Sequence, residues 1–551
     1  MRCGNELPLG LFSTLLTWGL LASTPSAQTP GNALQEGDTV IGVGHLTDVK
    51  PGVFNDQGMW IDLVDTDFPD LDRDFVLLRN GFVTLREGAT LFTPAGAKID
   101  EFRSYWMTNS GDLAMIMDMT GVPSANKTGA FWNTLPLAQL GLPFVSPQVP
   151  PGTTWQAFNV IKMNDSNTIL MLGQIKRPPA TRAEDCLIRF QVDSSGNLLS
   201  TDVLAVKNQI VPALGGDQIN ALGNTEHVIS MNRHGDYITL VDPVVGGAAY
   251  LLNLNTVLAQ ESGPSPIPDR NWKTLTLLPK LSLNDFGEYA FSGALDGSTN
   301  AYLVVKNGEK FAQEGDALPA LAPFVMGKGS SAPIYIANSG DVFWWVQASD
   351  GGANIDAYMR NDQVIVQQNR TVIEGIQVTK IESGESAFHV SPDGRFWLGK
   401  VDLQIIGHAL IMVDFGLVVP VPGCLGNPGK LRVLDGRPLP GSRIRFSMDN
   451  GQALGVTPVL IFSQHAAIPG SDCGIPSAFG EVLINTASKI GRSFGPLWGG
   501  SPSIISVNIP PSLALVDMEL FAQGFFWDVG DQTPAENFRL TNALRIEVGA
   551  P

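Results

Sequence analysis

Apolar and polar positions alternate along this chain in short runs that are separated by turn residues. The clearest stretch is Leu281–Asp316, where four apolar runs follow one another in up-and-down order. A turn at Asn284–Gly287 joins the first two runs, and Asn307–Gly308 joins the last two. Asn opens such turns by bonding its own backbone, and Gly supplies the positive φ that closes a tight hairpin. The pattern predicts four short antiparallel strands in one sheet.

The first of these turns recurs along most of the chain, as Asn-x-x-Gly or a near variant between apolar runs. The seven copies begin at Asn55, Asn109, Asn164, Asn232, Asn284, Asn338 and Ser391. Successive copies start 54, 55, 68, 52, 54 and 53 residues apart. Repeats of this period that each form one four-stranded sheet are typical of radial arrays, because a single sheet cannot bury both of its faces alone. We therefore predict an all-β fold with a seven-bladed β-propeller, with six or eight blades as alternatives.

One short segment near the N-terminus suggests how the ring closes. Ala33–Asp38 matches Phe311–Asp316 almost letter for letter, and the latter is the end of a fourth strand. No first three strands precede the N-terminal copy, and the last repeat ends without the acidic-glycine mark. We expect the N-terminal segment to add a strand to the last blade.

The repeat stops near residue 420, and the sequence becomes rich in Pro, Gly and Ser with short alternating strands. Several short strands with frequent turn signals are typical of a β-sandwich. We therefore expect a propeller over residues 28–419 and a C-terminal β-sandwich over residues 420–551.

The first 27 residues have one arginine, an apolar run and small residues near Ser26 and Ala27. This pattern predicts a secretory signal peptide that is cleaved near Ala27, with an uncleaved anchor as the alternative. No later stretch predicts a membrane span, since the most apolar one, Leu403–Val421, is interrupted by His408 and Asp414. We expect an exported protein, secreted or at the cell surface, with no membrane span after signal removal.

Charge and cysteines limit the possible partners and cross-links. A formal charge of −18 argues against binding to nucleic acid, because such binding requires a basic surface. Cys424 and Cys473 lie 49 residues apart in the C-terminal segment. In an exported protein they are the natural disulfide pair, which stabilises by about 4 kcal/mol in the chain-entropy model. Cys186 lies in an apolar strand and is expected to be a buried, inert thiol.

Both parts of the mature chain resemble known families. Leu283–Phe291 and Glu314–Asp316 resemble the LNdxGxvAF repeats with interleaved rEGD marks that occur in secreted bacterial proteins of uncharacterised function. The third copy departs from this pattern with Asn167 in place of Gly, and the last with Ser391 in place of Asn. The resemblance implies a propeller-like fold and export, and it brings no catalytic motif.

The C-terminal segment resembles a small β-domain found at the ends of exported proteins from the same kinds of bacteria. The matching residues are Gly423, Cys424, Pro438–Gly441, Cys473, Ile509, Pro510, Gln523, Gly524, Leu540–Leu544 and Gly549. This resemblance also implies architecture and export rather than an activity.

The sequence offers few residues for chemistry in known patterns. The motifs G-x-S-x-G, H-E-x-x-H and C-x-x-C, the P-loop and the Rossmann fingerprint are absent. The six histidines are scattered over different segments without a metal-binding spacing: His45, His227, His234, His389, His408 and His465. Tryptophans such as Trp344, Trp345 and Trp397 are expected to pack in the core, with an exposed sugar-stacking platform as the alternative.

The densest acidic cluster is DTDFPDLDRD in the first repeat, and its carboxylates are Asp65, Asp67, Asp70, Asp72 and Asp74. Calcium takes several carboxylate oxygens from closely spaced positions, so this loop is a candidate calcium site. The alternative is a solvated acidic loop, since the spacing is not that of an EF-hand. No other cofactor is expected.

We therefore expect a non-catalytic binding or scaffold protein that presents a propeller rim to a protein or a polysaccharide. The alternative is an extracellular hydrolase or lyase that acts on carbohydrate with carboxylates gathered in the channel. The two hypotheses differ in what should line the channel: paired carboxylates for the enzyme, small or apolar side chains for the scaffold.

Overall fold

The computed structural model describes residues 31–549, except for 41, 71–72, 276–279, 298, 330–331, 422, 426, 436–437, 450–455, 470, 472, 499–501, 517 and 528–538. The expected signal peptide, residues 1–27, lies outside the described residues. The described chain is all-β, and its only helical segments are single 3-10 turns. These turns are η2 (Ser124–Asn126), η3 (Pro212–Leu214), η4 (Glu226–Val228), η5 (Pro319–Leu321), η6 (Thr486–Ser488) and η7 (Leu513–Leu515).

In the described part of the chain before residue 415, the strands form seven antiparallel sheets in sequence order. The first three contain β2 (Thr39–Val40), β3 (Gly44–Phe54), β4 (Trp60–Thr66), β5 (Val76–Arg79) and β6 (Phe82–Arg86); β7 (Lys98–Met107), β8 (Leu113–Thr120), β9 (Thr128–Trp132) and β10 (Leu135–Gln139); and β11 (Thr154–Met163), β12 (Thr168–Lys176), β13 (Glu184–Val192) and β14 (Leu198–Val206).

The next two contain β15 (Ile210–Val211), β16 (Asp217–Leu222), β17 (Ile229–Met231), β18 (Tyr237–Pro243), β19 (Ala249–Leu252) and β20 (Thr256–Gln260); and β21 (Trp272–Thr274), β22 (Leu281–Leu283), β23 (Tyr289–Leu295), β24 (Tyr302–Lys306) and β25 (Glu309–Gln313). The last two contain β26 (Val325–Met326), β27 (Ile334–Ile336), β28 (Val342–Ser349), β29 (Asn354–Arg360) and β30 (Gln363–Gln367); and β31 (Val372–Ile373), β32 (Ile376–Ile381), β33 (Phe388–Val390), β34 (Phe396–Leu403), β35 (Gly407–Asp414) and β1 (Gly31–Gln35).

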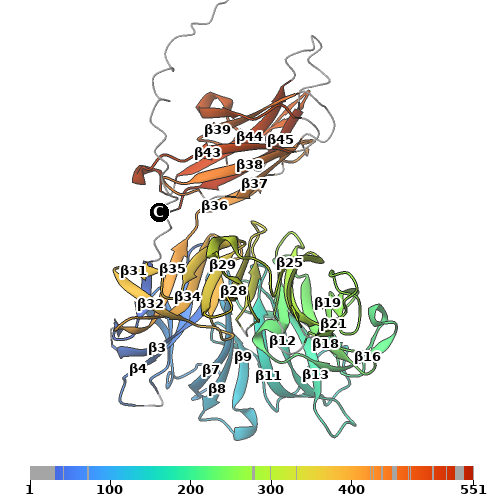
Figure 1. Ribbon diagram of the computed structural model, residues 1–551. Helices are drawn as coiled ribbons and strands as arrows, with labels where there is room; N and C mark the ends of the chain where they lie inside the picture. Colours follow the sequence, from blue (N-terminus) through green and yellow to red (C-terminus); the bar gives the residue numbers. More distant parts are fainter. Residues whose placement is uncertain are drawn as a thin grey trace, which may run out of the picture.

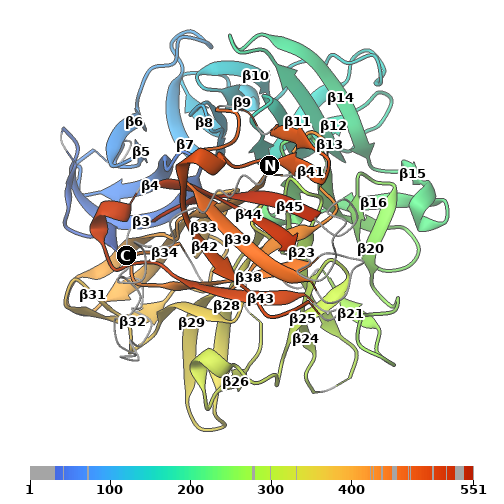
Figure 2. The same cartoon turned by 90° about the horizontal axis from the view of Figure 1, so that it is seen from above.

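These sheets are arranged propeller-like around a common centre (Figure 2). Neighbouring sheets share hydrophobic clusters, so both faces of a sheet are covered. Trp344, Trp345 and Trp397 are accordingly all buried, which confirms their expected core packing. Apolar residues at successive strand positions can be buried only when a sheet is sandwiched in this way.

The N-terminal strand completes the last sheet, as the sequence predicts. β1 pairs antiparallel with β35, with Gly31 opposite Met412 and Gln35 opposite Ala409. The backbone N–H of Gln35 donates to Asp38 Oδ2 at 2.9 Å, and Gln313 makes the same bond to Asp316 at 2.9 Å. The matching sequences thus form matching structures, although they lie 278 residues apart in the chain.

The remaining strands form a five-stranded sheet, a three-stranded sheet and a short hairpin. They are β36 (Leu417–Val421), β39 (Thr457–Ser463), β42 (Lys489–Phe494), β44 (Glu519–Trp527) and β45 (Arg539–Glu547); β37 (Lys430–Asp435), β38 (Arg443–Asp449) and β43 (Ser503–Asn508); and β40 (Ile475–Ser477) with β41 (Gly480–Val482). The two larger sheets share a cluster that includes Phe446, Leu460 and Phe526. This C-terminal part lies over one face of the propeller-like part (Figure 1).

Among the described residues, none of the helical segments has the length and apolar character that a transmembrane helix requires.

Deleting residues 28–38 should lower the melting temperature by roughly 5–10 °C, because β35 then keeps only β34 as a partner and Leu34 leaves the core. Differential scanning calorimetry of this variant measures the change, with a protein that starts at residue 28 as the control. An unchanged melting temperature would show that β1 does not hold the last sheet.

Candidate functional site

The turns that define the sequence repeats meet at the centre of the ring, around a cavity of about 110 Å³. In four repeats the side-chain oxygen of the first turn residue accepts hydrogen bonds from the backbone N–H groups two and four positions later. These residues are Asn55, Asn164, Asn232 and Asn284. The same side chain also donates from its amide nitrogen to a carbonyl oxygen of the next repeat, as from Asn284 to Ala337 at 2.9 Å. Asn is required because one planar group must both accept and donate.

Two repeats use a different register from the one that the Asn-x-x-Gly pattern predicts. The backbone hydrogen bonds place the first turn residue at Thr108 and Ala337, one position before Asn109 and Asn338. The asparagines at the following positions donate hydrogen bonds to aspartates of neighbouring turns instead. Asn109 donates to Asp165 Oδ2 at 2.7 Å, and Asn338 to Asp285 at 2.7 Å.

Together these contacts make a continuous ring of hydrogen bonds between neighbouring turns. The links run from Asn55 to Thr108, Asn109 to Asp165, Asn164 to Asn232, Asn232 to Asn284, Asn284 to Ala337, Asn338 to Pro392 and Asp393 to Asp56. The last link joins the final turn to the first, since the N–H of Asp393 donates to Asp56 Oδ1 at 2.7 Å. The ring therefore closes between residues that are 337 positions apart.

The closing turn contains a buried pair of carboxyl groups. Ser391 donates its hydroxyl to Asp393 at 2.5 Å, and the N–H of Arg395 donates to the same oxygen at 2.9 Å. Burial, and then the adjacent Asp56 carboxylate, raise the pKa of Asp393. Burial also raises the pKa of Asp56. The pair therefore holds a proton that two separate carboxylates would release.

The other carboxylates around the opening of the central cavity, its mouth, also bond to neighbouring turns. Asp165 accepts from both the backbone and the side-chain nitrogen of Asn109, at 2.6 and 2.7 Å. Asp285 accepts from the N–H of Arg233 at 2.8 Å in addition to Asn338. Acidic side chains thus line the cavity, but each bonds to a neighbouring turn.

Below the turns, aromatic and basic side chains line the channel. The Lys162 ammonium lies 3.9 Å from the centre of the Trp106 ring, a cation–π contact. The imidazole of His389 packs against Trp106 at 5.2 Å and Tyr335 at 4.8 Å. These residues precede the first turn residue of their repeats by two positions, and sequence analysis did not select them as a group. Once the turn register is known, this shared position identifies them.

His389 is held in its neutral form. Its Nδ1 accepts from the N–H of Phe54 at 3.3 Å, so the proton of the neutral ring lies on Nε2. Burial, and then the positive charges of Lys162 and His227, lower its pKa well below the usual range. His389, His227 and Tyr335 also line a second cavity of about 210 Å³. The wall is thus neither a row of free carboxylates nor an apolar lining.

The predicted calcium loop is only partly described, because Asp72 lies outside the described residues. Asp67 and Asp70 are exposed, and Asp67 accepts from the N–H of His45 at 2.7 Å. Asp74 is buried beside Glu87, whose pKa is raised to about 7, first by burial and then by Asp74. The fifth member, Asp65, is half-buried at the end of β4. Calcium binding here stays a prediction.

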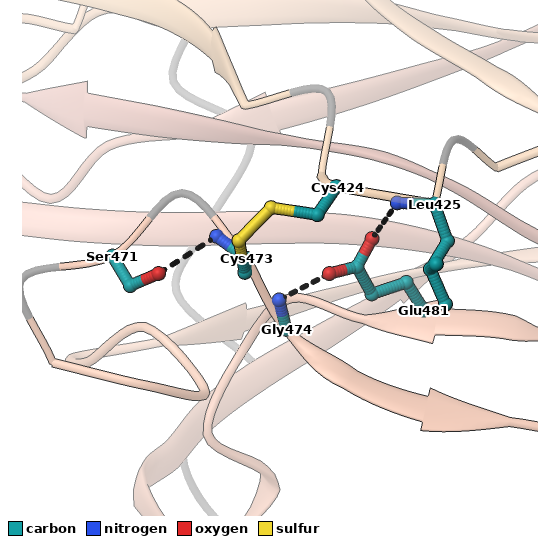
Figure 3. The surroundings of a disulfide bond; sticks show 6 residues. All are labelled: Cys424, Leu425, Ser471, Cys473, Gly474 and Glu481. Carbon is teal, nitrogen blue, oxygen red and sulfur yellow. Dashed lines mark hydrogen bonds between the residues drawn. A yellow bond between two sulfur atoms is a disulfide. The ribbon is translucent and has the colours of Figure 1, made fainter.

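The predicted disulfide is present between Cys424 and Cys473. Glu481 lies beside it and accepts from the N–H groups of Leu425, at 2.9 Å, and Gly474 (Figure 3). The bond thus joins the start of the C-terminal part to the hairpin that contains Glu481. Cys186 is buried as expected, and burial raises the pKa of its thiol.

Replacing Asn284 by Ala should lower the free energy of unfolding by about 2–3 kcal/mol, because two N–H groups and one carbonyl lose their partner. Urea denaturation of Asn284→Ala measures the loss. The exposed Asn255→Ala serves as the matched control and should change stability by less than about 0.5 kcal/mol. Equal effects of the two substitutions would contradict the role of the ring.

Asp393→Asn should make stability less dependent on pH. A carboxyl whose pKa is raised in the folded protein lowers the free energy of unfolding as pH rises from the unfolded value, about 4, to the folded value, about 8. The amide keeps an acceptor for Arg395 and carries no charge. The melting temperature of the variant should therefore gain several degrees on the wild type between pH 5 and pH 8.

Asp341→Asn is the control with the opposite sign. Burial raises the pKa of Asp341, but the charge of Arg360 and hydrogen bonds from Arg360, Ser339 and Asn361 together lower it below the usual value. That variant should be less stable than the wild type at neutral pH and approach it only on acidification. A parallel pH profile of Asp393→Asn and the wild type would contradict the shared proton.

No protein-family model matches the sequence, and no curated protein sequence matches it either. Among solved structures, the gluconolactonase XC5397 from Xanthomonas campestris is 9% identical and aligns over 71% of this chain and 98% of its own, with a TM-score of 0.22. TcdA4 from Morganella morganii is 8% identical over 80% of this chain and 22% of its own, with a TM-score of 0.16. Likenesses this weak carry no argument about activity.

Proposed function

We propose that the protein is a secreted or cell-surface binding protein without catalytic activity, built as a seven-bladed β-propeller with a C-terminal β-sandwich. The blade count is supported by the seven sheets and by the ring of seven linked turns. The sandwich is supported by the hydrophobic cluster that the two larger C-terminal sheets share. Export is supported by the apolar N-terminal segment of the sequence.

The observation that carries the proposal is that the carboxylates at the mouth of the central cavity already accept hydrogen bonds. Asp56, Asp165 and Asp285 each accept hydrogen bonds from neighbouring turns. A carboxylate that acts as nucleophile or general base must be able to reach a substrate. These carboxylates hold neighbouring turns together, so a substrate that bound to them would break the hydrogen bonds of the ring.

The position of the C-terminal part also favours binding at the rim. Arg395, next to the closing turn, forms an ion pair with Glu547 at the end of β45. The C-terminal strands lie across the centre of the ring in the view from above (Figure 2). The outer edges of the sheets are not covered in this way, and exposed aromatic side chains lie there, Phe82 in the outer strand β6 and Phe92 in the loop that follows it. A protein or a polysaccharide is the ligand class for such a surface.

The alternative is a carbohydrate-active hydrolase or lyase, and one observation favours it. The pKa of Asp393 is raised by burial and by Asp56, and a carboxylic acid with a raised pKa is what general acid catalysis requires.

Purified residues 28–551 should be incubated with a panel of polysaccharides, with and without calcium, and both co-sedimentation and new chain ends should be scored. We expect retention without new chain ends. Calcium-dependent retention would support a role of the Asp65–Asp74 loop.

Release of chain ends that Asp393→Asn abolishes would contradict the binding proposal and favour the enzyme. Asp341→Asn is the control for a general loss of stability in that comparison. Absence of both signals would exclude the tested polysaccharides and leave a protein as the ligand.

A further inference from the structure

Three side chains from separate segments meet where the ring closes, on the side of β1. Glu36 follows β1, Asp48 lies in β3 and His408 lies in β35. Nδ1 of His408 is 3.0 Å from Glu36 Oε1 and 3.0 Å from Asp48 Oδ1. The three side chains are 28%, 30% and 35% exposed, so water reaches the cluster.

Glu36 departs from the other glutamates at its position. In three other sheets the glutamate after the last strand donates its N–H to the opposite carbonyl, and its carboxylate accepts a backbone N–H near the start of the facing strand. These residues are Glu87, Glu261 and Glu314. Glu36 keeps the first bond, to the carbonyl of His408 at 2.9 Å. Its carboxylate faces the imidazole instead.

The second nitrogen of His408 also has a carboxylate beside it. Its Nε2 lies 3.4 Å from Asp402 Oδ1, so Asp402 can orient the tautomer that carries its proton on Nε2. Nδ1 then presents a lone pair toward two carboxylate oxygens. The three atoms can close around a proton on Nδ1, as a hydrogen bond from His408 to Asp48, or around a metal ion.

The charge of the cluster suits a divalent ion. Glu36, Asp48 and Asp402 carry three negative charges, and two ammonium groups offset two of them: Lys400, 2.6 Å from Asp48, and Lys380, 3.9 Å from Asp402. The net charge is therefore −1 with a neutral imidazole.

We propose that Glu36, Asp48 and His408 bind a divalent transition-metal ion, with Zn²⁺ as the test ion. Ligand atoms about 2.1 Å from a tetrahedral ion lie about 3.4 Å from one another, so Nδ1 and the two oxygens, now 3.0 Å apart, need to separate by only about 0.4 Å to hold it. The imidazole selects transition metals over calcium and magnesium. Water completes the coordination, and Asp402 orients the histidine.

The ion would bridge the N-terminal strand, the first sheet and the last sheet. It would therefore fasten the closure of the ring, and binding should stabilise the folded protein in proportion to the zinc concentration. This role is independent of what the rim binds.

Isothermal titration calorimetry of chelator-treated residues 28–551 with Zn²⁺ alone tests the proposal. We expect one site that binds Zn²⁺ more tightly than Ca²⁺ and a melting temperature that rises with Zn²⁺. Glu36→Gln and His408→Gln should each weaken binding at least tenfold. Asp402→Asn should weaken it about 10- to 100-fold.

Glu314→Gln is the matched control, because it removes the equivalent glutamate from another sheet without touching the cluster. It should bind Zn²⁺ like the wild type even where it lowers the melting temperature. Circular dichroism establishes that each variant is folded.

A spectrum of the Co²⁺-loaded wild-type protein gives a test that needs no substitution. Nitrogen and oxygen ligation gives weak visible bands, whereas a thiolate charge-transfer band would place the ion at a cysteine and overturn the proposal. Absence of Zn²⁺ binding, or unchanged binding by folded His408→Gln, would overturn it as well.

Discussion

Four of the seven links in the ring depend on one side-chain function, the ability of a turn asparagine to accept and donate at the same time. The oxygen of Asn284 fixes its own turn, and its nitrogen reaches Ala337 in the next repeat. An unpaired buried amide or carbonyl costs free energy, so each turn holds its neighbour in a defined position. Because the links run in a circle, the position of every sheet is set from both sides.

A circle made from one chain must be closed by contacts between its ends, and these contacts carry the unusual chemistry of the protein. At the mouth, Asp393 meets Asp56 and a carboxyl pair retains a proton. At the outer edge, β1 pairs with β35 and brings Glu36 to His408. Elsewhere in the described ring, neighbouring sheets follow one another along the chain. The junction between the first and last sheets has no such connection, and it holds both of these clusters of ionisable side chains.

The sequence predicted those features of the structure that follow from its repeats or from residues close together in the chain. The Asn-x-x-Gly spacing located the turns, the match between Ala33–Asp38 and Phe311–Asp316 predicted the added strand, and the cysteine count predicted the disulfide. The register at Thr108 and Ala337 was missed, although a signal was present. Asn109 precedes its glycine by two positions, whereas Asn55 precedes its glycine by three.

The channel and the proposed metal cluster could not be predicted in the same way. Lys162, Trp106 and His389 come together only through the radial packing of three repeats. Glu36 and His408 are 372 positions apart, and only the strand pairing of β1 with β35 relates them. Spacing motifs report neighbours within one element, so contacts that exist only after ring closure leave no such trace.

Closure also constrains where a ligand can act. Arg395 lies in the turn that completes the ring, and it forms an ion pair with Glu547. The C-terminal part is therefore attached at the seam, the junction where the last turn meets the first. A ligand that entered the mouth would have to displace that part or break the hydrogen bonds that hold the seam. A ligand at the outer edge of the sheets disturbs neither. The same contacts that stabilise the ring therefore favour recognition at its rim over chemistry at its centre.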